Sequence, residues 1–183
     1  VNYRFAHGTG SRSSAVPQGN GKIPKELLGN KLAFLVAEAV VLLTLLGKCW
    51  SIEQPSGTLM FKLPAFVGLR CLPSFVSVVF DQCMYGLEEL VDDGVASTGC
   101  RHRKRTEVWT NVTALEGLLL KCDGGHVHVP LQDCVIRAGR RVARTKLAAS
   151  YPSALCRAWS LLLLEAGIID TGACGELPHF SST

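Results

Sequence analysis

The stretch FVSVVF at residues 75–80 decides the fold, because valine and phenylalanine fill it and Asp81 follows it directly. A short run of β-branched and aromatic residues that ends at a polar residue predicts a buried β-strand. Two further strands are predicted on either side of it, CWSI at residues 49–52 and TEVWT at residues 106–110. We expect the strands at 75–81 and 106–110 to pair as a hairpin.

Helical segments alternate with these strands. The run LAFLVAEAVVLLTLL at residues 32–46 is apolar except for Glu38 and Thr44, and Gly47 is a plausible stop. Because a membrane span needs about 20 apolar residues, this shorter run predicts a helix over 31–47 buried in the middle of a domain. A helix is also predicted over 114–121, and a final one over 153–166. Alternating helices and strands indicate an α/β fold.

The length and composition indicate one domain. The chain has 183 residues, of which 48% are hydrophobic and 19% charged, so disorder and coiled coils are excluded. We expect a loop-rich, poorly ordered start over 1–30, an α/β domain over 31–167 and a flexible tail over 168–183. No signal peptide is recognised at the start of the sequence, and eight cysteines are too few for a small secreted disulfide scaffold. The expectation is therefore an intracellular protein with free thiols and no membrane partner.

Positive charge is concentrated in the second half of the chain. Residues 101–157 hold eleven Lys and Arg against four Asp and Glu, whereas the whole chain carries a net charge of +4. Such a basic region permits a nucleic-acid partner. Arg103 and Arg105 immediately precede the predicted strand at 106–110 and should point to the same side, where they could bind phosphate or hold a carboxylate. The alternative is an ordinary solvated run of charge.

Cys122, His126, His128 and Cys134 form a compact group of soft ligands in a turn-rich stretch. Zinc takes about four such ligands in tetrahedral geometry, so these residues are a candidate zinc site. Cys83 is the alternative fourth ligand. In the competing interpretation the two histidines alternate with valines along an exposed strand, and Cys122 is buried as a small hydrophobic residue.

Glu53 lies where a predicted strand ends, and ligands of open α/β sheets bind at such edges. The alternative for Glu53 is a solvated loop residue. A zinc site, a basic face and a carboxylate at a sheet edge are therefore the chemical features that the residues themselves predict.

Five segments together resemble a known family. IEQP at 52–55, FDQCMYG at 80–86 and RHRKRTEVWTN at 101–111 resemble, in order, the Glu-Asn-Val, Asp…Tyr-Gly and Gln-x-Arg-x-Arg segments of cytosine-5 DNA methyltransferases. CDGGHVH at 122–128 and KLAASYPSALCRAW at 146–159 resemble the tail of methyltransferase-like proteins found beside reverse transcriptases in mobile elements of some protists. The resemblance covers residues 27–160.

The resemblance implies the C-terminal half of a class-I methyltransferase-like, Rossmann-like sheet with a terminal β-hairpin and packed helices. Glu53 would match the glutamate that contacts the cytosine ring, and Arg103 and Arg105 the arginines that orient the flipped base. DNA would be the partner and the nucleus the expected location. The family's Phe-x-Gly-x-Gly cofactor loop and Pro-Cys nucleophile are missing from this sequence. We therefore expect a methyltransferase-like fragment that is inactive alone.

S-adenosylmethionine would bind only if a missing N-terminal half, or another chain, completed the domain. The alternative function is a nucleic-acid-binding or zinc-stabilised structural module of a mobile element, which kept the sheet without the chemistry.

Overall fold

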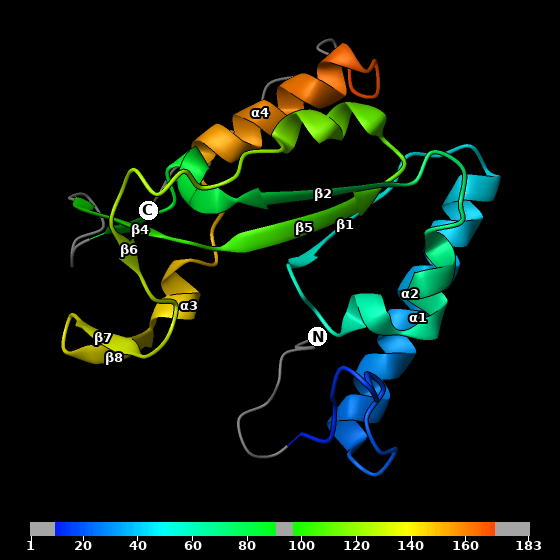
Figure 1. The fold of residues 1–183 in the computed structure, drawn as a ribbon, viewed down its shortest axis with the longest axis horizontal. Helices are drawn as coiled ribbons and strands as arrows, with labels where there is room; N and C mark the ends of the chain where they lie inside the picture. Colours follow the sequence, from blue (N-terminus) through cyan, green and yellow to red (C-terminus); the bar gives the residue numbers. More distant parts are fainter. Residues whose placement is uncertain (1–9, 91–96, 171–183) are drawn as a thin grey trace, which may run out of the picture.

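Helices lie on both faces of a three-stranded sheet in the computed structural model, which describes residues 10–90 and 97–170 (Figure 1). The predicted tail over 168–183 lies outside the described residues from position 171 onward, and so do residues 1–9 of the predicted loop-rich start. The α-helices are α1 (Pro24–Leu45), α2 (Pro64–Leu69), α3 (Arg144–Leu147) and α4 (Ser153–Glu165). The 3₁₀ helices are η1 (Met60–Lys62), η2 (Gln82–Tyr85) and η3 (Thr113–Leu118). The strands are β1 (Ser51–Pro55), β2 (Val76–Asp81), β3 (Glu88–Leu90), β4 (Ser97–His102), β5 (Arg105–Thr110), β6 (His128–Val129), β7 (Cys134–Arg137) and β8 (Arg140–Ala143). The predicted mixed α/β character is confirmed.

The central sheet has the order β1-β5-β2, so the last of its three strands lies in the middle. β5 is antiparallel to both neighbours, and β1 and β2 therefore run parallel to each other. Val108 of β5 is opposite Glu53 on one side and Val78 on the other. The predicted antiparallel pairing of the strands at 75–81 and 106–110 is confirmed.

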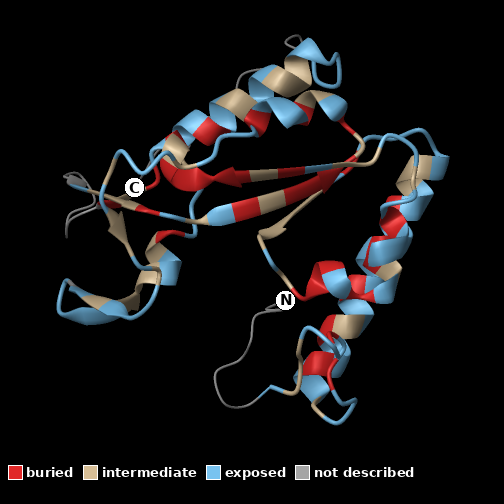
Figure 2. Cartoon of the chain, viewed as in Figure 1, coloured by how far each residue is buried: buried red, intermediate tan, exposed pale blue. Residues whose placement is uncertain are grey.

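Each face of this sheet has its own hydrophobic core. Trp109 points toward α1, η1 and α2, and the ring of Phe61 stacks on it with a centroid distance of 3.9 Å. Val108, next in the strand, points to the opposite face and packs with η3 and Leu155 of α4. Figure 2 shows the buried residues running along β2 and β5 between these layers. Alternation along β5 thus serves both cores at once.

The helix α1 differs from its predicted buried position. It begins at Pro24, before the expected Lys31, and only a narrow stripe of it is buried, which includes Ala33, Ala37 and Val40. The opposite side is apolar and exposed, because one layer of neighbours covers only one stripe of a helix. By length and composition alone α1 could also cross a bilayer, a test that core helices pass as well.

Two predicted segments took other conformations. The expected helix over 114–121 is the 3₁₀ helix η3, which packs closely on α4: a Cβ at Gly117 would lie 2.8 Å from a methyl group of Leu162. Residues 88–99, expected to be an exposed excursion, contribute β3 and the start of β4 to a second sheet of order β3-β4-β6. β7 and β8 form a separate hairpin.

The described part of the loop-rich start is tied to α1 by a buried carboxylate. Glu26 is 7% exposed and accepts a hydrogen bond of 2.8 Å from the backbone N–H of Ser11. The hydrogen bond from the Ser11 hydroxyl is the main cause that lowers the pKa of Glu26. Arg12 donates to Asn30 and to the Glu26 carbonyl. These contacts fix the chain where it enters the helix.

Candidate functional site

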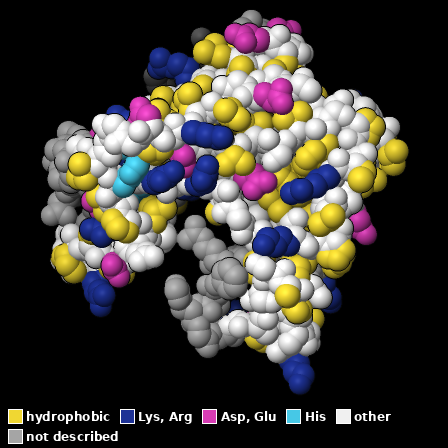
Figure 3. Space-filling view, viewed as in Figure 1, with side chains coloured by type: hydrophobic (Ala, Val, Ile, Leu, Met, Phe, Trp, Pro, Cys, Tyr) yellow, Lys and Arg dark blue, Asp and Glu magenta, His cyan; other side chains and the backbone are white. Residues whose placement is uncertain are grey.

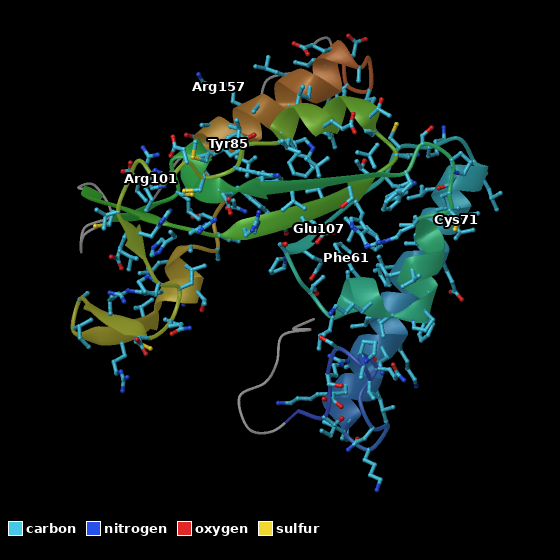
Figure 4. The ribbon with its side chains drawn as sticks, viewed as in Figure 1. Phe61, Cys71, Tyr85, Arg101, Glu107 and Arg157 are labelled. Atoms are coloured by element: carbon cyan, nitrogen blue, oxygen red, sulfur yellow. The ribbon has the colours of Figure 1, made fainter. Side chains whose placement is uncertain are left out.

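Two cysteines and two histidines converge beside the end of β2. The ligand atoms of Cys83, Cys122, His126 and His128, here called the Cys/His cluster, all lie within 4.8 Å of one another. The Sγ of Cys122 is 3.4 Å from Nε2 of His128 and 3.7 Å from Nε2 of His126. The two imidazole rings meet edge to face with centroids 4.6 Å apart. Figure 4 shows sulfur atoms gathered near Tyr85 and Arg101 at this end of the sheet.

The local chain path explains why these residues meet. β2 ends at Asp81, and η2 follows it, so that Cys83 turns back into the interior where it is fully buried. The Asp81 carboxylate accepts a hydrogen bond of 3.0 Å from the backbone N–H of Cys122, which anchors the loop after η3 beside Cys83. Gly124 has φ of +81°, a turn that glycine favours, and it folds His126 back toward Cys122. His128 is then held by the pairing of β6 with β4.

The spacing of these atoms fits a tetrahedral metal site. With the usual bond lengths to zinc, a sulfur and a nitrogen ligand stand about 3.6 Å apart in a tetrahedron. The two sulfur–nitrogen distances at Cys122, 3.4 and 3.7 Å, lie on either side of that value. Cys83 is buried and the other three are half-buried, so an ion there would be shielded from water. The Cys/His cluster can therefore hold a metal ion.

Burial sets the protonation of the cluster in the protein without metal. Burial, with the hydrogen bond to Cys122 as the next cause, raises the pKa of Cys83 from 9.0 to about 12. Desolvation lowers the pKa of His128, and the positive charges of His126 and Arg103 act in the same direction. His128 is therefore ready to bind a metal as a neutral imidazole, whereas Cys83 has to lose a proton first.

Cys134 does not belong to the cluster. It lies on β7, where it pairs with Ala143, and it is exposed to solvent. The predicted ligand set is thus corrected at one position, since Cys83 stands where Cys134 was expected. The sequence offers Cys83 only as the alternative ligand, because its approach to Cys122 depends on how β2 and η3 pack.

Arg103 and Arg105 lie on one side of the chain, next to the Cys/His cluster. Their Nε atoms are 3.7 and 3.9 Å from the same oxygen of Asp81, whose side chain is only 1% exposed. The two arginine side chains are 51% and 48% exposed, so their outer edges face solvent. Arg101 donates to the backbone carbonyl of Cys83 at 3.1 Å. The buried Asp81 thus holds two cations at the surface.

Glu53 occupies a different place, a pocket of about 270 Å³ that we call the Glu53 pocket. One carboxylate oxygen accepts a hydrogen bond of 2.8 Å from the Tyr151 hydroxyl, and the other is buried without a hydrogen-bond partner. Burial, and then the hydrogen bond to Glu53, raises the pKa of Tyr151. The Lys104 ammonium lies 5.0 Å from the centre of the Tyr151 ring.

The structure does not bring Glu53 together with the two arginines. Glu53 shares the sheet face of Val108, whereas Arg105 is opposite Asp81 on the other face. Among the described residues, no hydrogen bond or ion pair joins Glu53 to Arg103 or Arg105. No local signal in the sequence marks the hydrogen bond from Tyr151 to Glu53.

No family model matches this chain, and neither a curated protein nor a solved structure matches it. The two sites described above are therefore interpreted from their own geometry.

Proposed function

We propose that this chain is a zinc-stabilised module that binds nucleic acid through the basic face beside the Cys/His cluster. The observation that carries the proposal is the convergence of Cys83, Cys122, His126 and His128 at tetrahedral spacing. Mixed thiolate and imidazole sites of this kind are typical of structural zinc. All four ligands come from the protein, which leaves no open position for catalysis by the metal.

Zinc would act here by fixing the loop that follows η3 to the end of β2. Three of the ligands lie in one short loop that has few buried apolar side chains, so metal binding would contribute directly to its folding. The same loop carries β6, which pairs with β4 immediately before Arg103. A fixed loop therefore also fixes the two arginines.

The basic face supports a polyanionic partner. Beyond Arg103 and Arg105, the exposed basic side chains of the described region 101–157 are those of Lys121, Arg140, Arg141, Lys146 and Arg157. Figure 3 shows Lys and Arg side chains gathered over the middle of one face. Contacts of this kind address phosphates and release counterions, so they give affinity without reading base sequence. With DNA as the partner, an intracellular, nuclear location is part of the proposal.

Metal analysis of protein purified without an affinity tag tests the zinc half of the proposal. We expect about one zinc per chain and a fall in melting temperature when a strong chelator is added. His126→Ala should lower both zinc content and melting temperature, whereas Cys134→Ala, an exposed cysteine outside the cluster, should change neither. Zinc well below one per chain together with no chelator effect would contradict the proposal.

Fluorescence anisotropy with labelled single- and double-stranded DNA tests the nucleic-acid half. Binding should weaken by orders of magnitude between about 50 and 200 mM salt, because the affinity comes from phosphate contacts. Arg103→Ala with Arg105→Ala should reduce both affinity and salt dependence, while Lys48→Ala, outside the basic region, should not. Binding that is absent at low salt, or independent of salt, would contradict this half.

A second candidate, a part of a methyltransferase-like domain, is favoured by one observation. The last strand of the central sheet in sequence, β5, lies between the two parallel strands β1 and β2 and runs antiparallel to both. This arrangement agrees with the terminal hairpin of the class-I methyltransferase sheet that the sequence resemblance implies. The buried, unpartnered oxygen of Glu53 could accept a hydrogen bond from a ring N–H or an exocyclic amine of a base.

This chain's own residues do not fit S-adenosylmethionine, since the sequence contains no Phe-x-Gly-x-Gly loop, and it contains no Pro-Cys nucleophile. The candidate therefore predicts that the 183-residue chain alone transfers no labelled methyl group to DNA. Incorporation of label by the purified chain would contradict this prediction and would mean that residues other than the missing loop and nucleophile carry out the transfer.

A further inference from the structure

The outer side of α1 is an apolar surface without a neighbour in the described structure. Ten large apolar side chains between residues 27 and 46 are 39–80% exposed. The centre of this outer α1 face is a row of three leucines one heptad apart, Leu28, Leu35 and Leu42, exposed to 59%, 60% and 56%. Contiguous exposed apolar surface of this extent is typical of an interaction site.

The length of the face suits contact with a helix of a second copy. A standard interface buries roughly 800 Å² per partner. The 22 residues of α1 extend over about 33 Å. The row of exposed leucines and its apolar flanks extend along that whole length, so the face is long enough for helix-to-helix contact with a second copy.

Two residues of opposite charge lie within the apolar face, and their positions favour a second copy of the chain as the partner. Lys31 and Glu38 lie two turns apart, on the side of α1 that carries Leu35, and both are exposed. Neither makes a hydrogen bond or an ion pair within the described residues. In a parallel pair of α1 helices, each charge would meet its own copy. In an antiparallel pair related by a two-fold axis near Leu35, each Lys31 meets the partner's Glu38, and both pairs form at once.

The shape of the face is self-complementary in the same register. A hollow of about 320 Å³ lies between α1 and α2; Glu38 lines it together with the apolar side chains of α1 and α2, which are Phe34, Ala37, Val41, Leu42, Leu45, Ala65 and Leu69. The antiparallel register brings the partner's Leu28, which projects from the first half of the helix, opposite Val41. Each copy then offers a projecting side chain and a hollow to the other, as an isologous interface requires.

We propose that two copies of this chain associate through antiparallel contact of their α1 helices, with Lys31 of each copy paired to Glu38 of the other. A second copy covers the apolar face, leaves the buried stripe of α1 in its own core, and neutralises both charges. The interface lies away from the Cys/His cluster, so the proposal stands apart from the proposed zinc and nucleic-acid binding.

Sedimentation equilibrium of the whole chain, with charge-reversal variants, tests the proposal. We expect a mass that rises with concentration from 19.7 kDa to twice that value. Lys31→Glu and Glu38→Lys should each weaken the dimer about tenfold or more, because each change creates two like-charge contacts. The double variant K31E/E38K should restore it. Glu165→Lys, an exposed reversal on α4, is the control and should leave the dimer unchanged.

Three results would overturn the proposal. One is a protein that stays monomeric at about 100 µM, a concentration at which a micromolar dimer is nearly fully formed. Another is a double variant that dimerises no better than the single variants, since only the antiparallel pairing is rescued by exchanging the charges. The third is a monomer that floats with vesicles of zwitterionic lipid, which would make a bilayer the occupant of the face.

Discussion

The buried thiol of Cys83 should make the metal-free protein less stable as the pH rises above 9. Its pKa is 9.0 when unperturbed and about 12 in the folded protein. Between these values the unfolded chain releases the proton while the folded chain keeps it, so the folded state binds more protons and loses stability with rising pH. The contribution is fully present below pH 9 and disappears as the pH passes through 12.

The loss of stability at pH 10 depends mainly on the pKa of the Cys83 thiol in the unfolded chain. One pH unit above a pKa of 9.0, ionisation favours the unfolded state by about 1.4 kcal/mol. Urea unfolding at pH 7 and pH 10, with the protein freed of metal by a chelator, measures this free energy. The loss of unfolding free energy between the two pH values should be about 1.4 kcal/mol larger for the wild-type protein than for Cys83→Ala.

Cys71→Ala provides the matched control, because Cys71 is exposed and its loss should leave the pH dependence unchanged. Equal losses for the wild-type protein and Cys83→Ala would refute the reasoning. Zinc binding should have the opposite pH dependence. Because the thiols must be deprotonated to bind zinc, the apparent affinity for zinc should rise as the pH increases over the same range.

Further predictions concern the two cores and the Glu53 pocket. Trp109→Ala should lower the unfolding free energy by about 3–5 kcal/mol, because it removes a buried indole and its stacking on Phe61; urea unfolding measures this loss. Leu155→Ala should cost about 2–5 kcal/mol by the same assay, and a value below that range would mean that α4 packs loosely. Since burial and the hydrogen bond to Glu53 raise the pKa of Tyr151, wild-type stability should decline above pH 10, and that of Tyr151→Phe should decline less; an identical decline would show that the pKa of Tyr151 is not raised.

The parts of the fold that sequence could predict are those with a strong local pattern. The strand at 75–80 and the final helix at 153–166 appear within a residue or two of their expected bounds, since β-branched runs and Pro152 before a helix act locally. The strands β3 and β4 were missed because their acidic, small and cysteine-containing sequence resembles a loop. They are strands because β4 pairs with β3 on one side and with β6 on the other.

The candidate sites divide in the same way. Three of the four ligands of the Cys/His cluster lie within seven residues, so their spacing alone drew attention to them. Cys83 could be placed only as an alternative, since its contact with Cys122 depends on tertiary packing. The exposure of α1 could not be predicted from the sequence either, because hydropathy shows how apolar a helix is and not how many neighbours cover it.

The position of β5 has a consequence for the order in which the chain can assemble. Val108 of β5 is the sheet partner of both Glu53 in β1 and Val78 in β2, so neither β1 nor β2 can pair before β5 has been synthesised. During that interval α1 and the apolar strands are without the layer that joins them, and loop closure over this separation makes the step slow. Since both β1 and β2 wait for β5, substitutions in β5 should reduce folding yield more than equally buried substitutions in α4.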